Sequence, residues 1–422
     1  MWPRSNALMV GAAAMRRAAP SMSNPAMTEH PTDEPALRLL LNAQVYAPQA
    51  LGRQNLLLGG GKILWMGIDT PDLPAQLPVE TIDLQGRRLI PGLIDGHVHV
   101  TGGGGEAGFR TRVPAPMLSR YTRAGVTSVV GLLGTDDLAR GTRELVAGIY
   151  ALREEGLNAW GYCGGYHLPP ATLTGSVRGD VVFIEPLIGV GEIAISDHRS
   201  SQPTLDELLK LASEAHVAGL MTNKAGIVHL HLGDGPRGLE LVRQALDISE
   251  LPARVFNPTH VNRRKALFEE AVELARRGCH VDLTAFPVEE GEDAWTAEEA
   301  LIRYLDSGAP PERISVSSDA GGCLACFDEH GRMCGMGVGE SGALLDCLNA
   351  VLARGVDLER ALPAFTLNPA RLLRLPGKGL IAAGADADLV ALDANGAAFD
   401  VFIAGRAHLR DGAVLRRGNF EA

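Results

Sequence analysis

The feature that most constrains the fold of this chain is a regular alternation of short apolar segments with amphipathic helical segments, which begins near Pro91. Eight apolar segments of strand length follow one another: GLIDGHVHV, TSVVGLLG, NAWGYCGGY, IAISD, IVHLHLG, RVFNPTH, HVDLTAF and RISVSSD. Strands that alternate with helices form parallel sheets. Eight such units close into a barrel, so the sequence predicts a (β/α)8 TIM barrel.

The expected helices have the 3.6-residue apolar spacing of amphipathic helices. They lie near residues 117–124, 144–155, 204–218 and 265–277, and two more follow the last barrel strand near 341–354 and 358–374. Short β-rich runs separated by glycine and proline turns occupy the stretch before the barrel, and β character returns at the C-terminus. We therefore expect a barrel over 91–374 and a small β-sandwich domain formed by both chain ends, with parts at 37–90 and 375–422.

The first 36 residues differ in character from the rest. They contain three arginines and no acidic residue before Glu29, which gives a faint likeness to a secretory or transit segment. The short apolar patch is, however, interrupted by Gly11 and closed by Arg16 and Arg17. We expect residues 1–36 to be a disordered or mis-annotated N-terminal extension.

Charge and composition narrow the range of partners. With 50 acidic against 39 basic side chains the net charge is −11, which would repel phosphate backbones and anionic membrane surfaces. Aromatic residues make up only 5% of the chain, too few for a surface that stacks single-stranded nucleic acid. The sequence predicts a small-molecule substrate, with no nucleic-acid or membrane partner.

Cysteine usage indicates the compartment. Six unevenly spaced cysteines in 422 residues do not make a disulfide scaffold, so we expect a reducing, cytoplasmic location. No apolar run reaches the eighteen or so residues needed to cross a bilayer.

Polar side chains interrupt the apolar segments where barrel enzymes keep their chemistry, at the carboxyl ends of the strands. His97 and His99 form an HxH pair at the end of the first segment, and residues two apart on a strand point to the same face. Further candidate ligands accompany later strands: Glu192, which begins IAIS, and His231, His260 and Asp319. Four imidazoles and two carboxylates suit a pair of zinc-like divalent ions. Each of these residues alone could be an ordinary buried polar residue, but six of them at the ends of otherwise apolar strands are hard to explain as part of the hydrophobic core.

All of these residues except Glu192 stand within the longer motifs GHVHVTGGGGEAG, HLGD, PTHVNR and SSD, and the chain also contains the motifs GVTSVVGLLGTD and AISDHRS. From about Leu37 onward the chain resembles the amidohydrolase superfamily, and within it the isoaspartyl (β-aspartyl) dipeptidases. The resemblance implies two zinc ions per chain, held by His97, His99, Glu192, His231, His260 and Asp319. It also implies a homo-oligomer, an octamer in this family.

The resemblance further implies residues that contact the substrate. Glu106 would receive the substrate α-amino group, Arg199 and Arg263 would receive carboxylates, and Tyr166 would polarise the scissile carbonyl. Gly104, Thr135 and Cys323 match positions that contribute further substrate contacts. For catalysis we expect Asp319 to serve as general base and then general acid, and Tyr166 to stabilise the oxyanion.

Two departures from the family pattern matter. Many relatives carry a carbamylated lysine between the ions, and Glu192 stands in that place here, seven residues before Arg199. Its shorter reach needs a backbone shift, which one extra residue in this stretch could provide. Lys224 is the only obvious substitute, and it lies in a loop-like TNKAG segment. The second departure is Cys323, where the family pattern has a serine. It matters because a thiol makes a weaker hydrogen bond to the substrate than a hydroxyl does.

Two other functions remain open at this stage. One is a related amidohydrolase that acts on cyclic amides, similar to dihydropyrimidinase or dihydroorotase, although the GGGGEAG and SDHRS segments do not favour it. The other is a non-catalytic member of the fold used as an assembly scaffold, against which the complete ligand set argues. A substrate panel separates the first from a dipeptidase, and metal analysis separates the second.

Overall fold

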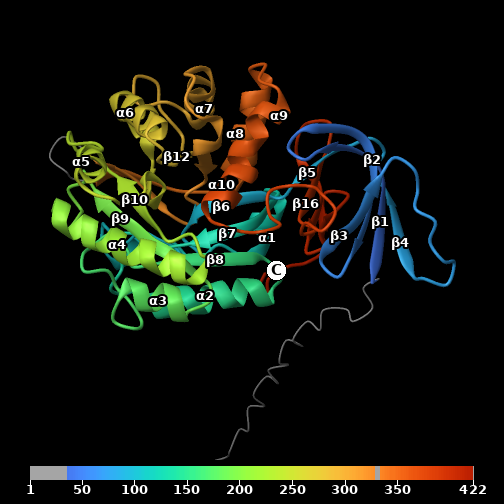
Figure 1. The fold of residues 1–422 in the computed structure, drawn as a ribbon, viewed down its shortest axis with the longest axis horizontal. Helices are drawn as coiled ribbons and strands as arrows, with labels where there is room; N and C mark the ends of the chain where they lie inside the picture. The colour runs from blue at the N-terminus through green and yellow to red at the C-terminus, as the bar shows by residue number, and fades with distance from the viewer. Residues whose placement is uncertain (1–35, 328–332, 422) are drawn as a thin grey trace, which may run out of the picture. The chain divides into compact units, whose positions relative to one another are not determined.

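The computed structural model describes residues 36–327 and 333–421, drawn in colour in Figure 1. Residues 1–36 were expected to be a disordered or mis-annotated extension. All of them except Ala36 lie outside the described residues. The described chain contains strands β1 to β19 and helices α1 to α10, and a central group of parallel strands is surrounded by helices (Figure 1).

Eight parallel strands form the barrel. They are β6 (Leu93–Val98), β7 (Val126–Gly131), β8 (Asn158–Cys163), β9 (Leu187–Ile195), β10 (Ile227–Leu232), β11 (Phe256–Thr259), β12 (Val281–Thr284) and β13 (Ile314–Ser317). The first six pair in sequence order, and β12 pairs with β13. The amide of His99 donates to the carbonyl of Ala320 at 2.8 Å, which joins the end of β6 to the segment after β13. Each of the eight predicted segments overlaps one of these strands, so the predicted barrel is confirmed.

The helices follow the predicted alternation. They are α1 (Leu118–Arg123), α2 (Thr142–Glu154), α3 (Val177–Phe183), α4 (Leu205–Thr222), α5 (Glu240–Ile248), α6 (Lys265–Arg276), α7 (Ala297–Asp306), α8 (Gly342–Ala353), α9 (Leu358–Ala361) and α10 (Leu367–Leu372). Single 3-10 turns, η1 (Phe109–Thr111), η2 (Ala253–Val255), η3 (Val261–Arg263), η4 (Pro311–Arg313) and η5 (Leu362–Phe365), link some of them. A capping box of Thr204 and Glu207 fixes the start of α4.

One helix prediction is wrong. The single helix expected over 358–374 is divided into α9, η5 and α10. Pro363 stands at the start of η5 and Pro369 lies inside α10. Because proline lacks an amide hydrogen and its ring clashes with the preceding turn, one continuous helix cannot form through this stretch.

Burial explains why the barrel strands are apolar throughout. Every residue of β7, β9, β10, β11, β12 and β13 is buried, because helices cover one face of the parallel strands and side chains fill the interior. Polar side chains in such strands are costly unless they have partners. Glu192, His229, His231 and Asp282 are therefore conspicuous among them.

The two chain ends share one nine-stranded mixed sheet. Its strands are β1 (Leu37–Tyr46), β2 (Ala50–Gly59), β3 (Lys62–Gly67), β4 (Val79–Asp83), β5 (Arg88–Pro91), β16 (Leu389–Leu392), β17 (Ala398–Ile403), β18 (Arg406–Arg410) and β19 (Ala413–Val414). Strand β5 pairs antiparallel with β16, so that Ile90 lies opposite Val390. The sheet has its own core, which includes Leu40, Leu56 and Phe402.

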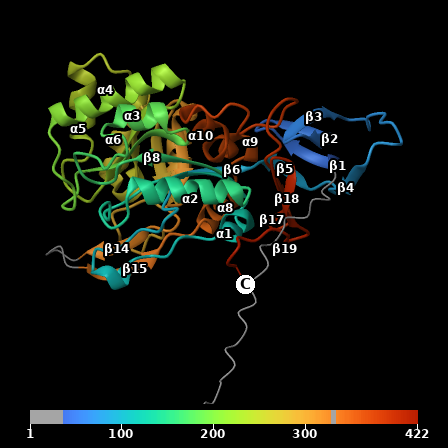
Figure 2. The ribbon, with the colours of Figure 1, turned by 90° about the horizontal axis from the view of Figure 1, so that it is seen from below.

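A separate antiparallel hairpin follows the last barrel strand. Its strands are β14 (Cys323–Phe327) and β15 (Met333–Val338), and Figure 2 shows them as a pair apart from the barrel sheet. The hairpin begins at Cys323, one of the expected substrate-contacting residues. Within the described ranges, no helix is both long enough and apolar enough to cross a membrane.

Candidate metal centre and catalytic site

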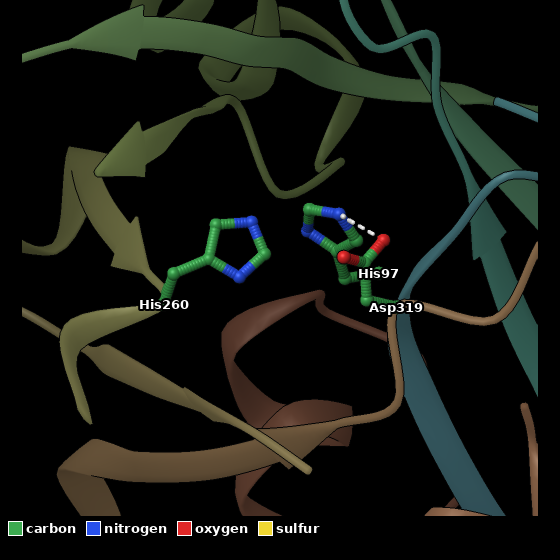
Figure 3. A group of neighbouring side chains, drawn as sticks. All are labelled: His97, His260 and Asp319. Atoms are coloured by element: carbon green, nitrogen blue, oxygen red, sulfur yellow. Dashed lines mark ion pairs between the residues drawn. The ribbon is translucent and has the colours of Figure 1, made fainter. Parts of the chain in front are cut away.

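The six expected metal ligands come together at the carboxyl ends of five barrel strands. His97 is in β6 and His99 follows it, Glu192 is in β9, His231 is in β10, His260 follows β11, and Asp319 lies just beyond β13. All six side chains are buried. Figure 3 shows His97, His260 and Asp319 facing one another across a common space. His260 and Asp319 both have positive φ, at 60° and 55°, where the chain turns out of its strand.

Glu192 is placed differently from the sequence expectation. It lies within β9, because this strand begins at Leu187 rather than at Ile193. Val190 pairs with Val228 while Ile193 pairs with Leu230, so β9 contains one extra residue at Gly191 and Glu192. This β-bulge supplies the backbone shift that a short carboxylate needs. Only glycine fits at 191, because a Cβ there would lie 2.7 Å from the Cβ of His229.

The two oxygens of Glu192 face different histidines. Oε1 lies 3.5 Å from His99 Nε2, whereas Oε2 lies 2.9 Å from His231 Nδ1 and 3.4 Å from His260 Nε2. On the other side, Asp319 Oδ1 lies 3.1 Å from His99 Nε2 and 3.4 Å from His97 Nε2. Glu192 thus stands between two groups of nitrogen atoms.

These residues fit a divalent metal site. Potential ligand atoms lie within 4.8 Å of one another in three overlapping groups: His97 with His260 and Asp319, His97 with His99 and Glu192, and Glu192 with His231 and His260. His97 Nε2 and Asp319 Oδ1 are buried and have no hydrogen-bond partner among the residues that the structure describes, although they face each other. A cation that accepts imidazole nitrogen and carboxylate oxygen satisfies both atoms.

The pKa shifts of the histidines and of Glu192 agree with a divalent metal site. Burial lowers the pKa of His231 to about 3, and it lowers the pKa of His260 well below its ordinary value. These rings are therefore neutral and keep a lone pair at physiological pH. Burial and then the negative charge of Asp319 raise the pKa of Glu192. Two carboxylates held together in a dry site repel each other, and a bound cation relieves that repulsion.

The histidines have fixed partners on the side away from the shared space. His260 Nδ1 lies 2.7 Å from Thr284 Oγ1, and His231 Nε2 lies 3.1 Å from Asp197 Oδ2. Asp197 also accepts from the Arg199 side chain, at 3.0 Å from Nε and 2.7 Å from Nη2. Asp197 was not among the residues expected at the site. Its position inside the SDHRS segment was the available signal, but the contact with His231 depends on a different strand.

Tyr166 follows β8 and points to the same space. Its hydroxyl oxygen lies 2.9 Å from His231 Nδ1, and its backbone carbonyl accepts from the amide of Ala194 in β9. The next residue, His167, contacts the buried carboxylate of Asp137 through both its amide and its ring, at 3.3 and 3.1 Å. These contacts hold the loop that carries Tyr166.

The expected substrate residues form a group of opposite charges beside the metal ligands. Arg199 Nη1 lies 3.8 Å from Glu106 Oε1, and Glu106 Oε2 is buried without a hydrogen-bond partner in the described part of the chain. Arg263 donates to the carbonyl of Leu232 at 2.9 Å and lies 3.4 Å from His231 Nε2. Carboxylate and guanidinium groups are thus both available within one partly buried region.

The remaining expected contacts lie close by. Burial and then the charge of Glu106 raise the pKa of the Cys323 thiol to about 12. Gly104 has a φ of +73°, and a Cβ there would lie 2.6 Å from the carbonyl oxygen of Thr111 and 3.3 Å from the Cβ of Cys323. The hydroxyl of Thr135 is buried and has no hydrogen-bond partner within residues 36–327 and 333–421, and a Cβ on its neighbour Gly134 would lie 2.8 Å from His99 Cε1.

Lys224 is not part of the site. Its Nζ donates to the carbonyls of Val181 and Ile184 at 2.6 and 2.8 Å, at the end of α3. The ammonium group satisfies carbonyls that the helix leaves unpaired.

The barrel and its histidine and carboxylate cluster define a class of metal-dependent hydrolase, and the chain belongs to the amidohydrolase family, whose model matches residues 88–410. A solved structure of a beta-aspartyl dipeptidase from Fervidobacterium islandicum AW-1, in complex with beta-Asp-Leu dipeptide, is 40% identical to this chain. The match covers 90% of this chain and 98% of that one, with a TM-score of 0.84.

More distant relatives share the fold. The imidazolonepropionase of Ruegeria sp. (strain TM1040) is 26% identical over 80% of this chain and 85% of its own length. The dihydropyrimidinase of Brevibacillus agri NCHU1002 is 17% identical, with a TM-score of 0.64 over 91% of this chain and 97% of that one. The predicted fold and the predicted family are confirmed.

Proposed function

We propose that this protein is a metallo-dipeptidase that hydrolyses the isopeptide bond of β-aspartyl (isoaspartyl) dipeptides. The observation that carries the proposal is the pairing of Glu106 with Arg199 at 3.8 Å beside the metal ligands. The relative solved with beta-Asp-Leu, 40% identical over nearly its whole length, supports it.

The chemistry of the substrate matches this pair of charges. A β-linked aspartyl residue keeps a free α-amino and a free α-carboxylate on the same carbon, so its recognition needs an anion and a cation close together. Glu106 supplies the anion and Arg199 the cation, with Arg263 as a further carboxylate partner. An α-linked dipeptide does not carry both groups on its aspartyl α-carbon, and the site therefore disfavours it.

The proposal includes two divalent ions per chain. We propose Zn²⁺, because imidazole nitrogens and carboxylate oxygens are ligands that suit this ion. His97 and His99 would hold one with Asp319, His231 and His260 would hold the other, and Glu192 would lie between them. The opposite orientation of the two Glu192 oxygens, toward His99 and toward His231, supports a bridging role.

When bound, such ions lower the pKa of a water molecule and polarise the substrate carbonyl. Asp319 would accept a proton from the attacking water molecule as the water oxygen bonds to the substrate carbonyl carbon, and would deliver this proton to the amine nitrogen as the C–N bond breaks. Burial alone would raise the pKa of Asp319, but contact with His97 and His99 holds it well below its ordinary value, so the group begins as a carboxylate. Burial raises the pKa of Tyr166, whose hydroxyl stays protonated and donates to the oxyanion.

A homo-oligomer in the cytoplasm completes the proposal. All five described cysteines, Cys163, Cys279, Cys323, Cys334 and Cys347, are free, which agrees with a reducing compartment. The octameric state implied by the family resemblance is open to direct measurement by light scattering.

The test is hydrolysis of β-Asp-Leu, α-Asp-Leu and dihydrouracil by purified protein whose metal content has been measured. Cleavage of β-Asp-Leu alone, with two ions per chain, supports the proposal. Cleavage of dihydrouracil instead would assign a cyclic-amide hydrolase. A metal-free protein with no activity on any of the three would favour the scaffold.

A further inference from the structure

We propose that His229 and Asn257 place a hydrogen on His97 Nδ1 and fix the orientation of the ring, and so leave His97 Nε2 as the nitrogen that binds a metal ion. The two side chains act as positioning residues that connect a metal ligand to a backbone carbonyl on a neighbouring strand. The inference rests on the metal site of the proposed function and concerns residues that no part of that mechanism uses.

The residues form a continuous chain of contacts through the buried barrel interior. His97 Nδ1 in β6 lies 2.8 Å from His229 Nε2 in β10. His229 Nδ1 lies 2.7 Å from Asn257 Oδ1 in β11, and Asn257 Nδ2 donates to the carbonyl of His280, just before β12, at 2.8 Å. All four residues are at most 2% exposed. We call this chain the His229 relay.

The direction of the relay follows from its far end. A backbone carbonyl only accepts hydrogen bonds, so the amide nitrogen of Asn257 must face His280 and the amide oxygen must face His229. An oxygen also only accepts, so His229 Nδ1 must carry the hydrogen. A neutral imidazole has one N–H, which leaves His229 Nε2 as an acceptor. The hydrogen in the contact with His97 therefore lies on His97 Nδ1.

The opposite arrangements conflict with the structure. Reversing the Asn257 amide would set two carbonyl oxygens 2.8 Å apart, with no hydrogen between them. A proton on both nitrogens of His229 would place a cation where its neighbours are His97, Asn257 and the stacked ring of Tyr162, none of which carries a negative charge. Burying an unpaired charge is costly, so His229 is neutral.

The consequence falls on the metal site. With a hydrogen on Nδ1, His97 can bind a metal ion only through Nε2, which lies 3.4 Å from Asp319 Oδ1 and 3.6 Å from Glu192 Oε2. A cation between these atoms accepts the nitrogen lone pair and is attracted by both carboxylates. Partners of this kind orient metal-bound imidazoles, and removing them typically weakens metal affinity 10- to 100-fold.

Two substitutions at one position separate hydrogen bonding from packing. His229→Phe keeps a ring that stacks on Tyr162 but removes both nitrogens. His229→Gln restores an acceptor for His97 and a donor for Asn257. Tyr162→Phe is the matched control, because it alters the other ring of the stack and leaves the relay intact. Asn257→Leu removes the far end of the relay and provides a second route if the His229→Phe variant does not fold.

The measurement is the affinity of each metal-free protein for Zn²⁺, by competition with a chelating dye, together with the visible spectrum of bound Co²⁺. We expect His229→Phe to bind Zn²⁺ about 10- to 100-fold more weakly and to show an altered Co²⁺ spectrum. We expect His229→Gln and Tyr162→Phe to stay close to the unaltered protein, and Asn257→Leu to fall between.

Several results would overturn the inference. A folded His229→Phe variant with unchanged Zn²⁺ affinity would remove the role of the relay, and equal losses in the Phe and Gln variants would assign His229 to packing alone. If the unaltered protein binds no Zn²⁺, both the relay and the metal site fail. If it binds Zn²⁺ and the two variants separate as expected, but β-Asp-Leu is not cleaved, the relay holds and the proposed substrate fails.

Discussion

Replacement of Glu106 by glutamine removes the negative charge that the proposed function assigns to the substrate α-amino group, while preserving the size of the side chain. The side chain of Glu106 is 9% exposed and faces Arg199 at 3.8 Å, so water screens its interactions only weakly. Loss of a buried charged partner costs about 2–4 kcal/mol. At about 1.4 kcal/mol for each tenfold change, kcat/KM for β-Asp-Leu should fall about 30- to 1000-fold.

The assay compares two substrates as well as two proteins. N-succinyl-leucine is β-Asp-Leu without its α-amino group, so the unaltered protein should cleave it poorly and Glu106→Gln should discriminate little between the two. Glu340→Gln is the control, because Glu340 forms an exposed ion pair with Arg120 at 3.9 Å, and such pairs contribute about 0–1 kcal/mol. Undiminished discrimination by Glu106→Gln would refute the assignment of this residue to the amino group.

Three further predictions concern catalysis and the metal. Asp319→Asn should lower kcat about 10²- to 10⁴-fold, the usual contribution of a general acid and base, while metal analysis shows most of the metal retained; normal turnover would remove Asp319 from proton transfer. Because the pKa of Cys323 is raised to about 12, its thiol should stay protonated through pH 9 and react slowly with iodoacetamide, and Cys323→Ser should lower KM through a stronger hydrogen bond. Fast, activity-linked alkylation at pH 8 would contradict this. Removal of metal by a chelator should abolish activity and lower the Tm, since a ligand that binds only the folded state stabilises it, and added Zn²⁺ should restore both.

The sequence predicted the barrel because burial leaves a strong signal. Parallel strands covered on both sides must be apolar along their whole length, and their carboxyl ends gather the polar residues. His97, His231 and Asp319 could therefore be assigned to one place without any knowledge of distances. The prediction of one helix over 358–374 was wrong. The apolar periodicity of this stretch indicates helical structure, but it does not show that Pro363 and Pro369 divide the stretch into shorter helices.

Contacts between distant strands left weaker signals. The strand was predicted only from Ile193 onward, whereas β9 begins at Leu187 and includes Gly191, which is needed for close approach to His229. Asp197 and Asn257 were not identified, because their roles depend on ring orientations of histidines on other strands. Sequence spacing determines the face of a strand on which a residue lies, but not the partner that meets it across the barrel.

The left-handed backbone at His260 and Asp319 restricts how the metal preference of this protein can be changed by laboratory evolution. Their φ values of 60° and 55° cost most residues about 1–2 kcal/mol, whereas asparagine, aspartate and histidine adopt this conformation more readily. A β-branched substitution at either position would damage the turn as well as the ligand, and its loss of activity would say little about metal chemistry. Mutant libraries at these two sites should therefore be restricted to histidine, aspartate and asparagine, so that survivors differ in the donor atom and share the same backbone.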